Sequence, residues 1–201
     1  MIKDLDWSSI LDVGCGEASF LKYLHEVKPD ASFSGADIAQ FLVEKNSKSM
    51  PFSKFYAIDI ENSFLGKKYD LVTAIDIIEH VNDDVKFLGN VHRMKKKYLL
   101  ICTLMGRMRP IEREVGHVRN YSEGELLHKL DIANFDILSI KRWGFPFYSP
   151  FYRNVLQHVP ESLNMGEFGL FKRAISQLLY GLFMLNLPGR GDCIIVLAKP
   201  K

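Results

Sequence analysis

A run of apolar residues that meets two glycines constrains the fold of this chain more than any other feature. Residues 10–20 read ILDVGCGEASF, in which Gly14 and Gly16 follow the run and apolar residues then recur at helical spacing. This pattern predicts a buried strand, a tight turn and a helix. The glycines permit backbone angles that other residues avoid and let a ligand approach the main chain, while the helix would offer it free N–H groups. A purely structural turn is the alternative at this point.

The rest of the chain alternates strand-like and helix-like segments. Apolar, β-rich runs predict seven strands, at residues 9–13, 31–37, 54–59, 69–76, 98–104, 135–143 and 192–199. Helical periodicity marks the segments 18–27, 40–47, 83–97 and 123–130. Ser122 is a plausible N-cap of the last of these, with Glu125 at the N3 position. This alternation predicts an α/β fold whose open, mostly parallel sheet is covered by helices on both faces.

The size and charge of the chain limit its class. With 201 residues, of which 47% are hydrophobic, it can form one domain whose core needs no disulfide or metal. The net charge of +2 is too small and too scattered to indicate a nucleic-acid partner. One basic cluster, made of Arg93, Lys95, Lys96 and Lys97, is interpreted as the solvated end of a helix.

Cysteine usage and the N-terminal residues indicate a cytoplasmic protein. Cys15, Cys102 and Cys193 are widely spaced, odd in number and set in apolar contexts. We interpret them as small core residues in a reducing compartment, and their spacing predicts no metal site. No apolar segment follows a basic start, so we expect no signal peptide.

Acidic residues end three of the predicted strands. They are Asp37, Asp59 and Asp76. In open parallel sheets ligands bind at the carboxyl ends of the strands, beside the first strand. Asp37 could accept hydrogen bonds from both hydroxyls of a ribose, and Asp59 could meet an exocyclic amine, with Ile38 and Ile60 as apolar walls. A single aspartate at a strand end is more often a turn former or a helix cap, but three beside a glycine turn favour a ligand site.

A fourth carboxylate, Asp12, lies inside the first apolar strand. A carboxylate is unfavourable there unless it is hydrogen-bonded. We therefore expect Asp12 to accept N–H groups of the turn or to orient a cationic group of a ligand.

Four motifs resemble those of the class I S-adenosylmethionine-dependent methyltransferases. In chain order they are DVGCGEA, ADI, AIDI and YDLVTAIDIIEHV. The chain resembles the small-molecule branch with an Asp-x-x-Glu-His signature after the fourth strand, over about residues 9–143 and again at 192–199. The resemblance implies a Rossmann-like three-layer α/β/α sandwich, a seven-stranded sheet whose last strand is antiparallel, and S-adenosyl-L-methionine as the cofactor.

The same resemblance implies roles for individual residues. The positions that match cofactor-binding positions of the family are Asp12, Gly14, Cys15 and Gly16 around the methionine portion, Asp37 and Ile38 at the ribose, Asp59 and Ile60 at the adenine, and Asp76 and Ile77 near the methionine amino group. Glu79 and His80 match a pair that lies close to the transferred methyl group in related enzymes. A helix-start cap combined with packing is an equal alternative for this pair.

Candidates for binding the acceptor follow the fourth, fifth and sixth predicted strands. His80 and His117 are the candidate bases, because a histidine titrates near neutral pH. In the loop after the fifth strand, His117, Arg119 and Tyr121 occupy alternate positions and could bind an anionic or hydroxylated acceptor; a surface loop without such a role is the alternative. Through its match to the family pair near the methyl group, Glu79 is a further candidate for contact with the substrate. Trp143 begins an aromatic run that either lines the substrate pocket or belongs to the core or a hinge.

Two departures from the family pattern concern how the site is closed. Ala18 stands where many members have a third glycine, and the N-terminal helices that cover the cofactor in relatives are nearly absent. Within a single domain of residues 1–201, we expect the insertion at about 144–191 to act as the lid. Its residues 167–187 predict an amphipathic helix with too many polar residues to span a bilayer. We expect this helix to pack against its own domain rather than on a membrane surface or a lipid.

Taken together, the sequence predicts a cytoplasmic enzyme that transfers a methyl group from S-adenosyl-L-methionine to a small-molecule acceptor. A nicotinamide-dependent oxidoreductase is disfavoured, because GCGEAS lacks the third glycine and no Tyr-x-x-x-Lys pair occurs. A non-catalytic binding module on the same fold, and a different reaction with the same cofactor, stay open. The acceptor, the methylated element and the oligomeric state are not defined by the sequence.

Overall fold

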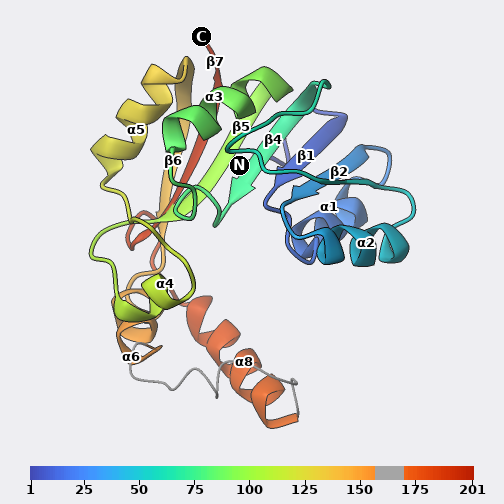
Figure 1. The fold of residues 1–201 in the computed structure, drawn as a ribbon. Helices are drawn as coiled ribbons and strands as arrows, with labels where there is room; N and C mark the ends of the chain where they lie inside the picture. The colour runs from blue at the N-terminus through green and yellow to red at the C-terminus, as the bar shows by residue number, and fades with distance from the viewer. Residues whose placement is uncertain (157–169) are drawn as a thin grey trace.

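A seven-stranded sheet forms the centre of the molecule. The structure, a computed structural model, describes residues 1–156 and 170–201. The strands lie in the order β3-β2-β1-β4-β5-β7-β6, and β7 alone runs antiparallel to its neighbours (Figure 1). Their bounds are β1 Ser9–Val13, β2 Ser32–Asp37, β3 Lys54–Ala57, β4 Tyr69–Ile75, β5 Lys95–Leu104, β6 Phe135–Trp143 and β7 Cys193–Pro200. The predicted fold class is confirmed, including the antiparallel last strand.

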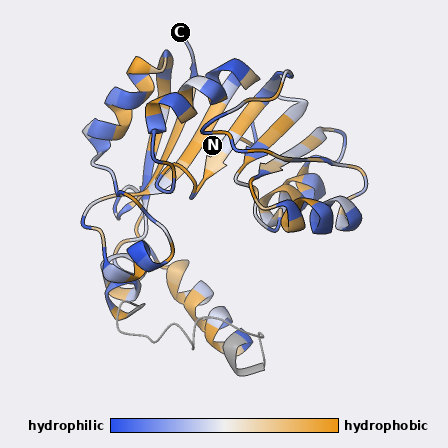
Figure 2. Ribbon diagram, in the orientation of Figure 1, coloured by the Kyte–Doolittle hydropathy of each residue, from blue (hydrophilic) through white to orange (hydrophobic). Residues whose placement is uncertain are grey.

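Helices cover both faces of this sheet. They are α1 Ser19–Val27, α2 Gln40–Ser49, α3 Asp84–Met94 and α5 Glu123–Ile132. One buried cluster joins α3 and α5 to the sheet through residues such as Phe87 and Leu126, and a second joins α1 through Leu21. Trp7 belongs to the second cluster, so the N-terminal residues fill part of the face that α1 leaves uncovered. Figure 2 shows the central strands to be hydrophobic along most of their length, as expected for strands buried on both faces.

The prediction of a solvated helix end holds for Arg93 but is wrong for Lys95, Lys96 and Lys97, which belong to β5. The helix α3 ends at Met94, and Lys95 already pairs with Tyr69 at the start of β5. Lys95 is buried, with its ammonium 5.3 Å from the centre of the Phe135 ring. Burial lowers the pKa of Lys95 to about 8. The pairing of the β5 main chain with β4 therefore overrides the helical pattern of the side chains.

Cys15 lies in the core, as predicted, whereas Cys102 and Cys193 are only partly buried and contact each other. Cys15 is buried against Gly35, where a β-carbon would lie 2.7 Å from the cysteine sulfur. Cys102 on β5 and Cys193 on β7 are both free thiols, with 3.4 Å between the two sulfur atoms. Their separation in the sequence hides this contact, which depends on β7 inserting between β5 and β6.

The segments after β5 and β6 extend the molecule beyond the sheet. The loop predicted after the fifth strand contains the short helix α4 Pro110–Glu114, which begins at a proline. After β6 come an irregular turn η1 Phe147–Tyr152, the short helix α6 Arg153–Leu156 and the helix α8 Leu170–Phe183. Residues Glu167 and Phe168, which begin the predicted amphipathic helix, lie outside the described residues. The helix itself is confirmed over Leu170–Phe183.

The helix α8 does not pack along its own domain, contrary to expectation. Figure 1 shows it beyond α4 and α6, directed away from the sheet. The ring of Phe183, at its C-terminal end, contacts the rings of Trp143, Tyr148 and Tyr152, with centroids 6.1, 5.5 and 5.2 Å away. Before Phe183, the side chains of Ile175 and others on α8 are mostly exposed.

Candidate functional site

A cavity of about 330 Å³ opens at the carboxyl ends of β1, β2, β3 and β4. Every segment that lines it follows a strand, as expected for a parallel α/β sheet. Among the residues singled out from the sequence, those that line the cavity are Gly14, Asp37, Ile38, Asp59, Ile60, Ile77 and His80. These are seven of the fifteen residues that line the cavity.

The turn after β1 is held by hydrogen bonds to β2. The N–H groups of Gly14 and Cys15 donate to the carbonyl oxygen of Ala36, at 2.8 and 3.1 Å. The N–H of Gly16 donates to Oδ2 of Asp37 at 2.8 Å. These turn N–H groups are thus already used within the protein. Gly14 lets the main chain of the turn lie close to Ile77. A β-carbon on Gly14, whose φ is +68°, would lie 2.7 Å from Cγ1 of Ile77.

Asp37 both lines the cavity and holds the turn. Its Oδ2 accepts from Gly16, and its Oδ1 accepts from the N–H of Ala39 at 2.9 Å. A carboxylate has about four lone-pair positions, so two acceptor positions remain for groups in the cavity. Ile38 beside it is 74% exposed, and Ile60 across the cavity is buried. Two apolar side chains thus flank the carboxylates.

Asp59 shapes the next loop in a similar way. Its Oδ1 accepts from the N–H of Glu61 at 2.9 Å, and its Oδ2 accepts from Nδ2 of Asn62 at 2.7 Å. The carboxylate of Glu61 in turn accepts the N–H groups of Asn82 and Asp83, at 2.9 and 3.1 Å. Glu61, Asn62 and Asn82 all line the cavity, and the sequence reasoning missed them. The signal was the run of polar residues directly after Asp59.

Asp12 lies beneath the cavity and does not line it. It is paired in register with Thr73 of β4, whose hydroxyl donates to Oδ1 of Asp12 at 2.6 Å. It accepts no N–H group of the turn, contrary to expectation, because those groups are used by Ala36 and Asp37. Burial, with a smaller contribution from the charge of Asp37, raises the pKa of Asp12 to about 7.

His80 and His117 come together at the edge of the cavity. Their rings meet edge to face, with centroids 4.6 Å apart. Burial, and then the charge of His117, lower the pKa of His80. His80 is therefore mostly neutral at pH 7 and can accept a proton. Asp76 lies nearby, at the end of β4, in a left-handed conformation with φ of +50°.

Glu79 is placed behind the histidines, inside the protein. Its side chain is fully buried, and Oε2 accepts from the hydroxyl of Thr103 at 2.9 Å. Its Oε1 has no hydrogen-bond partner among the described residues. Burial raises the pKa of Glu79 to about 7. Glu79 is thus a buried acid beside the site and does not line the cavity.

The structure places Arg119 and Tyr121 away from the cavity. The Arg119 guanidinium and the Tyr121 hydroxyl both bind Oδ2 of Asp84, at 2.8 and 2.9 Å, and Lys129 binds its Oδ1 at 2.8 Å. Tyr121 is buried in the core. The two residues therefore hold the loop after β5 against α3. Their alternate spacing with His117 did not reveal this, because Asp84 is distant in the sequence.

A second cavity, of about 160 Å³, lies on the other side of His117. Its walls are mainly apolar, and its lining residues are Leu104, Ile111, Glu112, Val115, His117, Tyr148, Tyr152 and Arg153. His80 lines the first cavity and His117 the second, so the histidine pair lies where the two approach each other. Trp143 lines neither cavity and contacts Tyr148, with ring centroids 5.1 Å apart.

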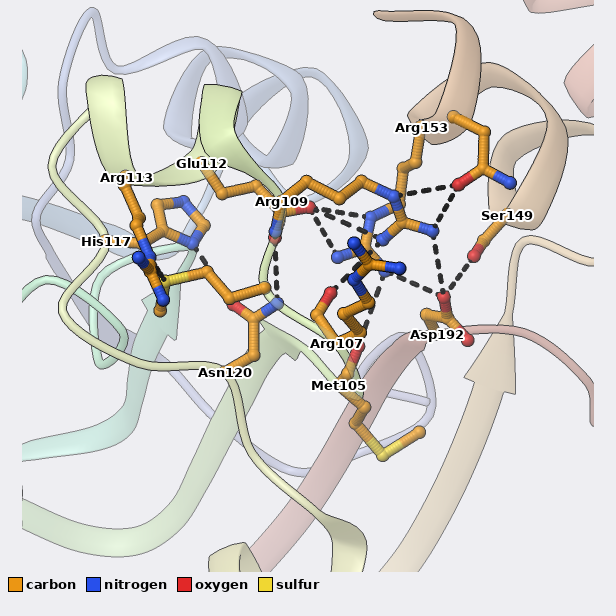
Figure 3. Close-up of polar contacts among 12 residues, drawn as sticks. Met105, Arg107, Arg109, Glu112, Arg113, His117, Asn120, Ser149, Arg153 and Asp192 are labelled. Atoms are coloured by element: carbon orange, nitrogen blue, oxygen red, sulfur yellow. Dashed lines mark hydrogen bonds and ion pairs between the residues drawn. The ribbon is translucent and has the colours of Figure 1, made fainter. Parts of the chain in front are cut away.

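A buried network of ion pairs supports the second cavity (Figure 3). Arg153 donates through Nε to Oε1 of Glu112 at 2.9 Å and through Nη1 to Oδ2 of Asp192 at 2.8 Å. The N–H of Arg109 and Nδ2 of Asn120 both donate to Oε2 of Glu112 at 2.9 Å. Burial disfavours the charged form of Glu112, but these hydrogen bonds outweigh burial and lower its pKa. The network joins α4, α6 and the start of β7 into one unit.

Within residues 1–156 and 170–201, no group of three or more His, Cys, Asp or Glu side chains is arranged to hold a metal ion. Among the helices in the same ranges, none has both the length and the apolar character needed to cross a bilayer.

Comparison with known proteins bears on the first cavity. Residues 11–97 match the family model of a methyltransferase domain. This range contains all of β1 to β4 except the first two residues of β1, and every residue that lines the first cavity.

Curated relatives carry methyltransferase names. The chain is 39% identical over 85 residues to a malonyl-[acyl-carrier protein] O-methyltransferase from Acetivibrio thermocellus, covering 40% of this chain and 30% of that protein. It is 32% identical over 112 residues to a ubiquinone biosynthesis O-methyltransferase from Rickettsia bellii, covering 53% of this chain and 44% of that protein. The chain thus spans less than half of the length of either relative.

A solved structure shares the fold over nearly the whole chain. A magnesium protoporphyrin IX methyltransferase from Synechocystis, solved with bound SAM, is similar with a TM-score of 0.59 at 15% identity. The similarity covers 98% of this chain and 72% of that protein. At this identity the likeness establishes the fold.

Proposed function

We propose that the chain is an S-adenosyl-L-methionine-dependent methyltransferase that acts on a small-molecule acceptor. The proposal rests on the first cavity. There the glycine turn after β1 meets Asp37 and Asp59, which lie at the ends of β2 and β3. The match of residues 11–97 to a methyltransferase domain supports it. As part of this proposal, Asp76, Glu79 and His80 form an Asp-x-x-Glu-His signature.

The residues of the first cavity fit this cofactor. Asp37 keeps acceptor positions for the two ribose hydroxyls, and Asp59 offers a carboxylate for the exocyclic amine of adenine. Ile38 and Ile60 flank the site as walls for the purine ring. Gly14 and Ile77 border the end of the cavity nearest His80, where the methionine portion would lie. When bound, S-adenosyl-L-methionine supplies an activated methyl group.

The second cavity is the proposed acceptor site. It is separated from the first by His80 and His117, which places an acceptor beside the histidines. The apolar walls and the two tyrosines favour a small apolar or aromatic group, and the paired charges of Glu112 and Arg153 offer no net charge to an ionic acceptor. If the nucleophile is a hydroxyl, His80 is the group able to take its proton, because its lowered pKa leaves it neutral at pH 7.

We further propose that the protein works in the cytoplasm. Its three cysteines are free, and the sulfur atoms of Cys102 and Cys193 lie 3.4 Å apart without forming a disulfide. Thiols so close together persist most readily in a reducing compartment.

Isothermal titration calorimetry tests the cofactor assignment. We expect S-adenosyl-L-methionine to bind the protein, and we expect NAD to give no heat of binding. Asp37→Asn removes the charge while keeping one acceptor oxygen, and the loss of a charged hydrogen bond weakens binding roughly 10- to 100-fold. Asp131→Asn, at an exposed aspartate on α5, is the matched control and should bind like the parent protein.

Three outcomes separate the alternatives. Failure of S-adenosyl-L-methionine to bind, or NAD binding at the same site, would contradict the proposal. Cofactor binding without methyl transfer to any member of a panel of small hydroxylated apolar compounds would favour a binding module, or a different reaction with the same cofactor.

A further inference from the structure

The helix α8 and the residues that follow it present apolar side chains to solvent in several directions. Leu178, Tyr180, Met184 and Leu185 are exposed by 74, 68, 69 and 63%. Within α8, Leu178 and Tyr180 point to different sides of the axis at 100° per residue, and Met184 and Leu185 follow the end of the helix. Figure 2 shows α8 as a largely hydrophobic helix standing apart from the sheet. Exposed apolar side chains gathered in this way usually mark an interaction site.

The charged residues within this apolar segment are basic. Residues 168–191 contain Lys172, Arg173 and Arg190; the acids Glu167 and Asp192 lie directly outside it, and Asp192 is paired with Arg153. Arg173 lies in the first turn of α8 and Arg190 lies beyond its end, and both are exposed. Basic residues that flank an apolar helix are typical of helices that lie on anionic lipid, where the long side chains reach the headgroups.

The length of α8 argues against a membrane span. Its described part, Leu170–Phe183, has 14 residues, whereas a spanning helix needs about 20. A helix of this length with exposed apolar side chains can lie in the plane of the interface instead.

We propose that α8 docks the protein on an anionic lipid surface, with its apolar side chains in the interface and its basic residues at the headgroups. A second copy of this chain fits less well, because its own α8 would bring the same positive charges against the first. Anionic lipid would neutralise those charges.

The docking surface is continuous with the second cavity. Phe183 of α8 contacts Tyr148 and Tyr152, and both tyrosines line that cavity. Where the proposed function also holds, an acceptor could pass from the lipid surface along these rings to His117. The inference then deepens the function by naming the acceptor as a lipid-soluble compound.

Vesicle sedimentation with the full chain tests the docking. We expect the protein to sediment with vesicles of phosphatidylglycerol and phosphatidylcholine, to bind vesicles of phosphatidylcholine alone at least tenfold more weakly, and to lose binding as salt is raised. The double change Leu178→Glu and Leu185→Glu should reduce binding to the anionic vesicles at least tenfold. Ile132→Glu, at an exposed apolar residue of α5, is the matched control and should bind like the parent protein.

The same preparations distinguish this inference from the proposed function. Calorimetry with S-adenosyl-L-methionine reports on the first cavity, and the double variant should retain the parent affinity because its changes are on the surface. Cofactor binding without vesicle binding would overturn the docking proposal alone, whereas vesicle binding without cofactor binding would overturn the function alone. Concentration-dependent dimers that the double variant abolishes, in a protein that ignores vesicles, would assign α8 to a second copy.

Discussion

At the scale of single residues, buried carboxylates differ according to their partners. Glu112 is buried but receives hydrogen bonds from Arg153, Asn120 and the Arg109 N–H, and its pKa is lowered. Glu79 is buried with one hydroxyl donor, and its pKa is raised to about 7. The desolvation of a charge is compensated in the first case and largely uncompensated in the second. Glu79 therefore exchanges a proton near neutral pH, directly behind His80.

Glu79→Gln is expected to change how stability depends on pH. The raised pKa means that the folded protein binds the proton of Glu79 more tightly than the unfolded chain does. This proton contributes about 3 kcal/mol to the free energy of unfolding. The contribution is fully present below about pH 4.5 and is lost as the pH rises to about 7. Urea denaturation at pH 4, 6 and 8 should therefore show the variant gaining stability relative to the parent as pH rises. A stability difference that is the same at all three values would contradict the assignment.

Alanine substitutions at Gly14 and Gly16 can be compared directly, because both residues lie in the turn after β1. Both have positive φ, at +68° and +50°, so alanine at either position costs about 1–2 kcal/mol of backbone strain. Only at Gly14 would the new β-carbon meet Ile77, including its Cβ at 3.0 Å, whereas nothing lies within 4 Å at Gly16. We expect Gly14→Ala to be the more destabilising by about 1–3 kcal/mol, measured by urea denaturation. Equal losses would mean that Ile77 moves aside freely.

At the scale of elements, the sequence predicted the sheet well because each strand carries its own signal. Apolar runs such as residues 69–76 end at an acid. The start of α5 was also predicted, because Ser122 caps it by accepting a hydrogen bond from the N–H of Glu125 at 3.2 Å. The pattern failed at Lys95, where a helical periodicity continues into residues that β5 draws into the sheet. Local periodicity cannot report a pairing that is decided by a distant strand.

The site was predictable to the extent that its residues follow strands directly. Asp37 and Asp59 were found because each comes at the end of its own strand. The network of Arg109, Glu112, Arg153 and Asp192 was missed, because its members come from three segments with no fixed spacing. Burial of these charges becomes visible only once α4, α6 and β7 are brought together.

Arg153→Leu tests whether this network holds the three segments together. The change removes the nearer of the two buried cations beside Glu112 and leaves Arg109, whose Nη1 lies 3.7 Å from Oε1. Removing one member of a buried pair is expected to destabilise the region by about 3–5 kcal/mol. Hydrogen exchange of the α4 amides should then accelerate. Lys201→Met, which breaks the exposed pair with Asp131, is the control and should leave this exchange unchanged. Unchanged protection of α4 in Arg153→Leu would show that the network is not what holds it.

At the scale of the whole molecule, the two cavities divide the chain into two functional parts. The residues that line the first cavity all lie within 13–87, in the half of the sheet formed by β1 to β4. The residues that line the second all lie within 104–153, in the segments after β5 and β6. The parts meet at His80 and His117, and α8 extends from the second part. Under the proposed function, this division would let the acceptor site vary while the cofactor site is kept.

The central claim is that the first cavity holds an adenosyl group. Its most direct test is a crystal structure of the protein grown with S-adenosylhomocysteine. We predict the ribose hydroxyls on the carboxylate of Asp37, and the adenine between Ile38 and Ile60 with its amine toward Asp59. A structure at saturating ligand in which this cavity stays empty, or in which the ligand lies elsewhere, would contradict the account.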